Sequence, residues 1–312
     1  MQAVPPLPLC HFNEALIPAV QALVASPIRE NVRGATLTTF AIGGALRALV
    51  TVESVEELSK VLSLLGREGQ PVRVLGNGSN VLVSDEGLHE WIVKLGAGLK
   101  RVESSGSRFE VFGAASLMSF ARKVSDDGFS GLEFAAGIPA SLGGAAFMNA
   151  GAHGAEICSR VSMVRGVLSD GSLREWRRDE LPWRYRSSGL PGGAIVTSVV
   201  LDLVEGDKEA IARKCSENLS ARRATQPLSL PSAGSVFKNP SPERPAGKIL
   251  ESVGMKGRII GGASVAEIHA NWIVNARREA TAKDVLALID LCRETARAKD
   301  AVELEPEVKV WS

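Results

Sequence analysis

The clearest periodic pattern in the sequence lies between two short apolar runs. Apolar side chains recur three or four residues apart after Ser54, which is the spacing of one face of an α-helix. Ser54 and Glu57 have the spacing of a capping box, and Gly69 ends the pattern. The apolar positions of this face are Val55, Leu58, Val61, Leu62 and Leu65. Because the runs 47–52 and 72–75 resemble strands, the segment predicts a βαβ unit.

Strand-like and helical patterns continue to the C-terminus. We expect strands over 91–95, 109–112, 161–168 and 194–204, and helices over 116–126 and 208–223. The residues 205–207 interrupt the pattern and predict that a separate C-terminal domain begins there. Thr281 and Asp284 predict a second capping box, ahead of a helix with the apolar face Val285, Leu288, Ile289, Cys292 and Ala296. A short strand over 307–311 closes the chain.

One long stretch departs from these patterns, because no charged residue lies between Glu133 and Glu156. Glycine and alanine dominate it. Glycine adopts positive φ and lets the backbone approach a ligand closely, and successive N–H groups in such turns form concave anion sites. Large apolar side chains are too few for a membrane span. The stretch therefore favours a large ligand with a pyrophosphate at its centre.

A second loop of this kind, Gly76-Asn77-Gly78-Ser79-Asn80, follows the strand expected over 72–75. Open α/β sheets place ligands at such strand ends, although this loop alone is typical of an ordinary turn. Neither the GxGxxG fingerprint after a strand nor the GxxxxGK[ST] motif occurs. The two loops together indicate a dinucleotide bound by a fold other than the Rossmann fold.

Composition narrows the functional classes further. The 312 residues carry a net charge of +1 and a single tyrosine, which argues against a nucleic-acid surface or an anionic membrane as partner. Four scattered cysteines without CxxC spacing indicate reduced thiols in a cytoplasmic protein, and four scattered histidines predict no metal site. The segment 1–13 lacks the pattern of a signal peptide.

Three further segments have the residue types of a catalytic site. They are 183–188, with two arginines and the tyrosine, 233–240, with a Gly-Ser turn followed by Lys and Asn, and 304–308, with two glutamates. Each taken singly also fits a bland structural role, as a solvated face, a strand end or an exposed carboxylate.

Taken in order, the motifs change that balance. They are Thr39-Phe40-Ala41-Ile42-Gly43-Gly44, Leu75 to Asn80, Gly137-Ile138-Pro139 through Asn149-Ala150-Gly151, Tyr185-Arg186 with Ser188, Gly234 to Pro240, and Glu305-Pro306-Glu307. From about Leu37 to Trp311 the chain resembles the flavin-dependent UDP-N-acetylenolpyruvoylglucosamine reductases of bacterial peptidoglycan synthesis. Only 49 positions separate Arg186 from Ser235, so the chain is similar to the shorter class, which lacks a tyrosine-bearing insertion.

The resemblance implies an α+β fold, with a two-subdomain FAD-binding region of the vanillyl-alcohol-oxidase (PCMH) type and a C-terminal α+β substrate domain. We expect an N-terminal segment over 1–35, the FAD-binding region over 36–205 with subdomains of about 36–80 and 81–205, and the substrate domain over 206–312. Noncovalent FAD would be bound by Ile42, Gly43, Gly76, Asn77, Gly78, Ser79, Asn80, Gly137, Ile138, Pro139, Ser141, Gly143, Gly144, Asn149 and Gly151.

The resemblance also implies the chemistry. NADPH would supply hydride through FAD to the β-carbon of the enolpyruvyl sugar, and UDP-N-acetylmuramate would be the product. Arg186 and Glu307 match the family's catalytic arginine and glutamate, and Ser235 matches its proton donor. Tyr185, Lys238 and Asn239 take substrate-binding positions. The enzyme is expected to be a monomer in the cytoplasm, without a metal and without nucleic-acid or membrane partners.

Two other readings stay open at this point. One is another flavin-dependent oxidase or dehydrogenase of the same fold, in which His153 would offer a covalent tether for flavin. The other is a nucleotide-sugar binding protein without turnover. The first leaves the Gly234–Pro240 motif unexplained, and the second gives no reason for Arg186, Ser235 and Glu307 together.

Overall fold

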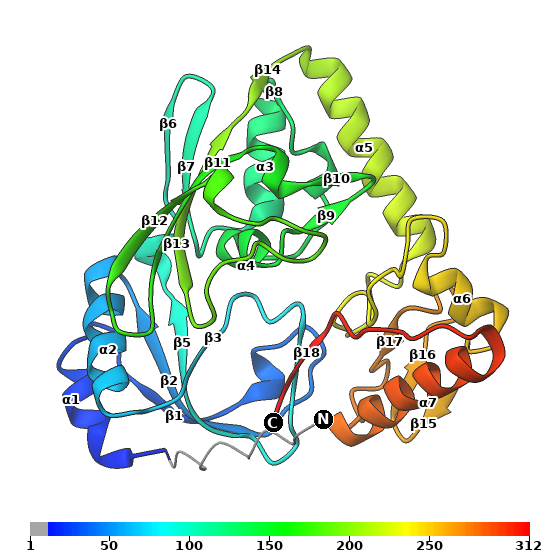
Figure 1. Cartoon of the computed structure of the whole chain (residues 1–312), viewed down its shortest axis with the longest axis horizontal. Coiled ribbons are helices and arrows are strands. Elements are labelled where there is room, and N and C mark those ends of the chain that lie inside the picture. The colour runs from blue at the N-terminus through cyan, green and yellow to red at the C-terminus, as the bar shows by residue number, and fades with distance from the viewer. Residues whose placement is uncertain (1–11) are drawn as a thin grey trace.

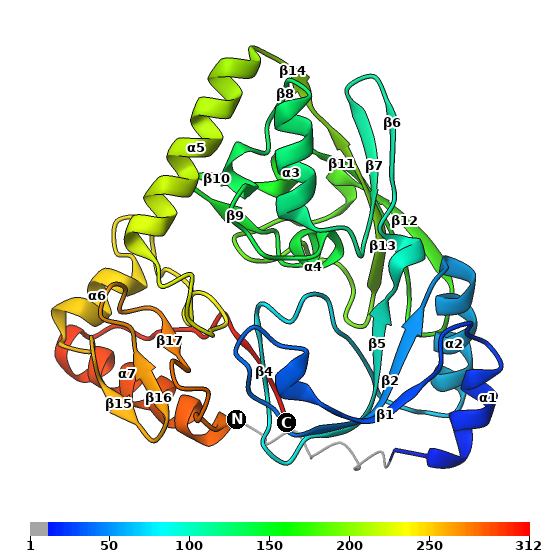
Figure 2. The same cartoon turned by 180° about the vertical axis from the view of Figure 1, so that it is seen from behind.

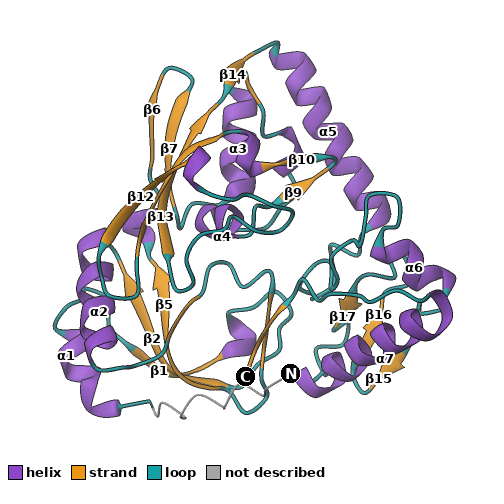
Figure 3. Cartoon of the chain, viewed as in Figure 1, coloured by secondary structure: helices purple, strands orange, loops and turns teal. Residues whose placement is uncertain are grey.

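The computed structural model describes residues 12–312, which form three parts (Figure 1). Residues 1–11, with Cys10 and most of the segment 1–13, lie outside the described residues. The first two parts carry the two larger sheets, and the third combines short strands with two helices (Figure 3). This mixture is the expected α+β architecture.

The first part contains a four-stranded sheet in the order β1 (Arg29–Arg33), β2 (Ala45–Val52), β5 (Leu88–Leu95) and β3 (Val72–Val74). Strands β2, β5 and β3 are parallel, and β1 is antiparallel to β2. The predicted βαβ unit is confirmed with one difference, because β5 lies between its two strands. Ahead of the sheet, the chain forms a 3₁₀ turn over Glu14–Leu16 and the short helix α1 (Ile17–Gln21).

Helix α2 (Val55–Arg67) connects β2 to β3 and buries four of the five predicted apolar residues, while Val55 is half-buried. Ser54 caps it by accepting a hydrogen bond from the Glu57 N–H at 3.1 Å. The reciprocal half of the predicted capping box is wrong, since the Glu57 carboxylate accepts from the Glu53 N–H at 2.7 Å. The carboxylate also accepts from the Ala25 N–H, which ties the segment after α1 to this helix.

The second part is built on an antiparallel five-stranded sheet. Its order is β12 (Leu173–Arg177), β11 (Val161–Val167), β13 (Ile195–Asp202), β7 (Arg108–Phe112) and β6 (Val102–Ser105). Seven of the eight residues of β13 are buried, among them the polar Thr197 and Ser198. Helices α3 (Leu117–Asp126) and α4 (Leu142–Phe147) contribute to the core of this part. Two short pairs complete it: β8 (Phe129–Ser130) with β14 (Val204–Glu205), and β9 (Gly151–Ala152) with β10 (Ala155–Glu156).

Helix α5 (Lys208–Thr225) begins at the predicted break, where Asp207 caps it, and runs from the second part to the third (Figures 1 and 2). It buries only Ile211 and Asn218, because most of its surface faces solvent. This explains why its sequence is polar on nearly every side.

The third part contains α6 (Ala246–Ser252), the sheet β15 (Ile259–Ile260), β16 (Ala263–Val265) and β17 (Ile273–Val274), and helix α7 (Ala282–Asp300). The second predicted capping box is confirmed at Thr281 and Asp284, and the predicted apolar face of α7 is buried. Phe40, Ile42 and Leu82 from the first part belong to the same core. The first and third parts therefore share apolar packing.

The last strand, β18 (Lys309–Trp311), leaves the third part and pairs in parallel with β4 (Val81–Val83) of the first (Figure 2). The sheets favour different part boundaries from those expected from sequence. Strands β1 and β5 belong to the first sheet although they lie outside the range 36–80, and β18 returns to that part from the range 206–312. Because of this return, the segment Glu305–Glu307 lies where the chain passes from the third part to the first.

Candidate functional site

A cavity of about 2160 Å³ lies where the three parts meet. Most residues predicted for the site line it, although they come from distant positions in the sequence. These are Gly76, Asn77, Gly78, Ser79, Asn80, Gly137, Ile138, Pro139, Ser141, Gly143, Gly144, Gly151, Arg186, Ser235, Asn239 and Glu307. One cavity thus unites both glycine-rich loops with all three predicted catalytic residues.

The loop 76–80 is fixed from both sides. The ammonium group of Lys94 on β5 donates to the carbonyl of Gly76 at 2.8 Å, and the side-chain amide of Asn77 donates to the carbonyl of Pro139 at 3.2 Å. Gly78 has a φ of +64°, and a Cβ there would collide with the carbonyl oxygen of Leu37. The two glycine-rich loops are therefore held together by protein contacts alone.

The second loop leads into α4, whose N-cap Ser141 accepts from the Gly144 N–H at 3.3 Å. The two glycines after Leu142 differ in their surroundings. A Cβ on Gly143 would lie 3.0 Å from the carbonyl oxygen of Val196, whereas one on Gly144 would meet only the Ser141 hydroxyl, at 3.2 Å. Gly144 is exposed and lines the cavity, so it presents open backbone to a ligand.

Three residues predicted to bind the cofactor do not line this cavity. Ile42 is 2% exposed and belongs to the core shared with the C-terminal part. Gly43 has a φ of +134° and packs its backbone against Val83. Asn149 is fully buried and binds Glu156, Cys158 and the backbone of Arg184. The side chains of Ile42 and Asn149 are thus directed into the protein and Gly43 has none, so the predicted cofactor contact of these three residues would have to come from their backbone.

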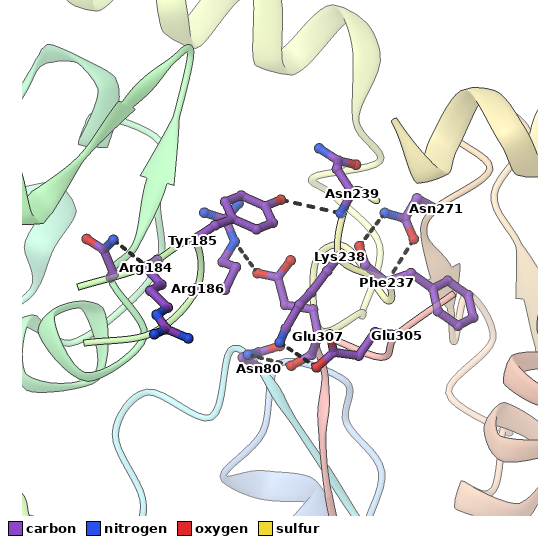
Figure 4. A network of polar contacts seen from close by, with 11 residues as sticks. Asn80, Arg184, Tyr185, Arg186, Phe237, Lys238, Asn239, Asn271, Glu305 and Glu307 are labelled. Atoms are coloured by element: carbon purple, nitrogen blue, oxygen red, sulfur yellow. Dashed lines mark hydrogen bonds and ion pairs between the residues drawn. The ribbon is translucent and has the colours of Figure 1, made fainter. Parts of the chain in front are cut away.

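Arg186 and Glu307 both line the cavity and form an ion pair with each other (Figure 4). Arg186 Nε donates to Glu307 Oε1 at 2.7 Å, and the two side chains are only 18% and 14% exposed. Burial raises the pKa of Glu307, and the positive charge of Arg186 opposes this rise. A carboxyl group with a raised pKa takes up a proton more readily, as a hydrogen-bond donor to a substrate carboxylate must.

Ser235 lies beside Glu307 because their segments pair through the backbone. The Glu307 N–H donates to the carbonyl of Val236 at 2.7 Å, and the Lys238 N–H donates to the carbonyl of Glu305 at 2.9 Å. The buried amide of Asn271 clamps Phe237 through two hydrogen bonds of 2.8 and 2.9 Å (Figure 4). Isolated antiparallel bridges join Ser235 to Trp272 and Phe237 to Pro306 in this motif.

The predicted substrate-binding residues lie at the rim of this arrangement. Lys238 Nζ pairs with Glu305 at 2.5 Å, and the Tyr185 hydroxyl accepts from the Asn239 N–H at 3.5 Å (Figure 4). The guanidinium of Arg186 lies 4.7 Å from the centre of the Tyr185 ring. Asn239 lines the cavity, whereas Tyr185 and Lys238 do not.

Three cavity-lining residues that no sequence motif singled out have buried polar atoms without a partner within residues 12–312. They are Arg222 (Nε), Gln226 (Oε1) and Trp272 (Nε1). Burial lowers the pKa of Arg222, and the charge of Arg186 lowers it further. Such atoms offer hydrogen bonds to a polar ligand. Arg222 and Gln226 lie at the C-terminal end of α5, a polar helix whose sequence contains no motif that indicates a binding site.

Across the described range 12–312, the structure contains no cluster of His, Cys, Asp or Glu suited to a metal ion. Nor does any helix in that range combine the length and apolar character needed to cross a membrane. Cys158, Cys215 and Cys292 are free thiols.

Comparisons with known proteins match both the expected regions. Residues 46–177 match a family model described as an FAD binding domain, and residues 226–311 match one described as the UDP-N-acetylenolpyruvoylglucosamine reductase C-terminal domain. A protein of that name from Halalkalibacterium halodurans is 41% identical over 95% of this chain and 98% of its own. One from Bacillus subtilis is 41% identical over 88% of this chain and 90% of its own.

A solved structure agrees with these matches. The crystal structure of UDP-N-acetylenolpyruvylglucosamine reductase (MurB) from Thermus caldophilus has 38% sequence identity and a TM-score of 0.80. The similarity covers 91% of this chain and all of the Thermus chain.

Proposed function

The chain belongs to the UDP-N-acetylenolpyruvoylglucosamine reductase family, and from this premise we propose how its residues divide the reaction. The resemblance, the FAD-binding fold with its substrate domain and the activity expected from sequence are confirmed. The protein is an FAD-dependent oxidoreductase that reduces a small UDP-sugar in peptidoglycan synthesis. The two other readings, a different flavin oxidase and a binding protein without turnover, are thereby set aside.

The cavity suits FAD on structural grounds. Its volume of about 2160 Å³ exceeds that of common small-molecule sites, and two glycine-rich loops line it. We propose that N–H groups of residues 76–80 and of the loop after Gly137 bind the pyrophosphate, with no covalent tether at His153. FAD, when bound, relays a hydride from NADPH to the β-carbon of the substrate.

Arg186 is proposed to bind the substrate carboxylate as negative charge develops at the α-carbon. A guanidinium presents two parallel N–H donors to a carboxylate, and its charge acts strongly in a site shielded from water. The 2.7 Å pair with Glu307 supports this assignment, because it fixes Arg186 at the cavity wall. Glu307, with its raised pKa, is proposed to take up a proton and share it with the same carboxylate.

Ser235 is proposed to donate the proton to the α-carbon after hydride reaches the β-carbon. Its hydroxyl has no hydrogen-bond partner within the described chain, so it is free to serve a ligand. The proton lost from Ser235 would be regained from water. Lys238, Tyr185 and Asn239 are proposed to bind the UDP-sugar diphosphate at the rim, after the Lys238–Glu305 pair opens.

NADPH and the sugar nucleotide are proposed to use the same part of the cavity in turn. Both must bring a reacting carbon to the same ring atom of FAD, and Arg186, Ser235 and Glu307 all line the same cavity. We further propose that the enzyme is a monomer and acts in the cytoplasm, because its cavity is assembled from one chain and NADPH and UDP-sugars are cytoplasmic metabolites.

The observation that carries this proposal is the convergence of Arg186, Glu307 and Ser235 on a cavity lined by both glycine-rich loops. The test is an initial-rate study with NADPH and the enolpyruvyl sugar nucleotide varied together. We expect parallel double-reciprocal lines and inhibition by excess sugar nucleotide. Intersecting lines, which indicate a ternary complex, would contradict the shared site.

A further inference from the structure

Asn149 lies two residues before β9, the first strand of the β9–β10 hairpin. Its side chain is fully buried and its φ is +45°, a conformation that asparagine adopts more readily than most residues. Nδ2 donates to Glu156 Oε2 at 2.9 Å and to the carbonyl of Arg184 at 3.0 Å, while Oδ1 accepts from the Cys158 N–H at 3.2 Å. The hydrogen-bonding capacity of Asn149 is therefore directed at protein groups, away from the cavity.

The turn that Asn149 contacts is the one that carries Arg186. The backbones of Arg184 and Ser187 exchange two hydrogen bonds of 2.9 Å, and Arg186 between them has a φ of +58°. A non-glycine residue in this region is strained and persists only when its surroundings hold it. The Ser188 N–H donates to the carbonyl of Phe147, the last residue of α4, at 3.2 Å. Both supports thus come from the segment that follows the glycine-rich loop.

From these contacts we propose that Asn149, together with Glu156, is a positioning residue for Arg186. It fixes the strained turn against the end of α4, and so sets the guanidinium relative to the flavin-binding loop. The proposal rests on the role given to Arg186 under Proposed function. Asn149 touches neither Arg186's guanidinium nor the cavity, so it acts through the backbone of the turn.

The chemistry of the contacts selects a discriminating substitution. Asn149→Asp keeps the volume and the tolerance of positive φ, but it replaces the Nδ2 donor by an acceptor. That acceptor would face the carbonyl of Arg184 and the carboxylate of Glu156, and both contacts would become repulsive. Glu156→Ala removes one of the two acceptors and leaves the contact with Arg184 intact, so it is the milder second variant.

The experiment uses the holoenzyme and stopped-flow absorbance at the flavin band. For Asn149→Asp we expect flavin content and the rate of bleaching by NADPH within about threefold of wild type. Reoxidation by the enolpyruvyl sugar nucleotide is expected to slow at least about tenfold, and Glu156→Ala to show the same pattern to a smaller degree. In an Arg186→Ala background, Asn149→Asp should slow reoxidation no further, because the group it positions is gone.

Each outcome decides between the alternatives. Loss of flavin from Asn149→Asp in proportion to activity would restore a cofactor role and overturn the proposal. So would an Asn149→Asp effect of full size in the Arg186→Ala background, or equal slowing of both half-reactions. If Asn149→Asp does not fold, Glu156→Ala and its double variant with Arg186→Ala apply the same criteria. If Arg186→Ala alone leaves reoxidation unchanged, the role of Arg186 itself is wrong.

Discussion

We expect that replacing Ser235 by alanine separates the two half-reactions of this enzyme. The hydroxyl has no role in accepting hydride from NADPH, so bleaching of the flavin band should stay near wild type. In the proposed mechanism the hydroxyl protonates the α-carbon, so reoxidation by the enolpyruvyl sugar nucleotide should slow sharply. A positioned acid contributes roughly 10²–10⁴ in rate, or about 3–5 kcal/mol of barrier.

The structure also sets the expected cost in stability. Ser235 is half-buried, and its hydroxyl makes no hydrogen bond within residues 12–312, so Ser235→Ala removes no such contact. Other hydrogen bonds hold this segment in place. The Glu307 N–H donates to the carbonyl of Val236, and the side-chain amide of Asn271 makes two hydrogen bonds with the backbone of Phe237. We therefore expect a change in unfolding free energy within about 0.5 kcal/mol, typical of substitutions away from buried features.

Stopped-flow absorbance under anaerobic conditions measures both half-reactions, and thermal unfolding measures the stability. Ser229→Ala is the matched control, because Ser229 lines the same cavity from an exposed loop and should leave both half-reactions within a few-fold. Equal slowing of both half-reactions in Ser235→Ala, or of neither, would refute Ser235 as the proton donor. A large loss of stability would assign it a structural role in the Gly-Ser turn.

Two further predictions concern the cofactor loop and the ion pair. Gly144→Ala should lower flavin content at purification while keeping or raising the thermal stability of the apoprotein, because alanine favours helix by roughly 0.5–1 kcal/mol and the new Cβ meets only the Ser141 hydroxyl. Full flavin retention would contradict the loop assignment. Burial raises the pKa of Glu307, so the stability contributed by its neutral form is present at low pH and is lost as pH rises through the folded-state pKa. Glu307→Gln should therefore gain unfolding temperature relative to wild type as the pH rises above the ordinary pKa of glutamate, and parallel pH profiles would contradict the raised pKa. The same variant should slow reoxidation by roughly 10²-fold or more if Glu307 shares its proton with the substrate.

The sequence alone determined the elements whose signals are local. Helix α2 and helix α7 followed from apolar spacing and from the caps Ser54 and Thr281, because helix contacts join residues three or four apart. The family followed from ordered motifs, and the same motifs predict Arg186, Ser235 and Glu307 as the catalytic residues. The glycine-rich loops indicated close backbone contact with a ligand, because glycine adopts a positive φ, such as the one of Gly78, without steric cost.

The tertiary structure decided what depends on distant segments meeting. Strand β5 inserts between β2 and β3, and β18 returns to β4, since strand pairing is set by packing of whole sheets and not by local periodicity. Asn149 belongs to the same sequence motif as the glycines of the second loop. Its side chain nevertheless points into the protein, where it donates a hydrogen bond to the carbonyl of Arg184. Arg222 lies on a helix with no apolar face, and only the folded chain buries its Nε at the cavity wall.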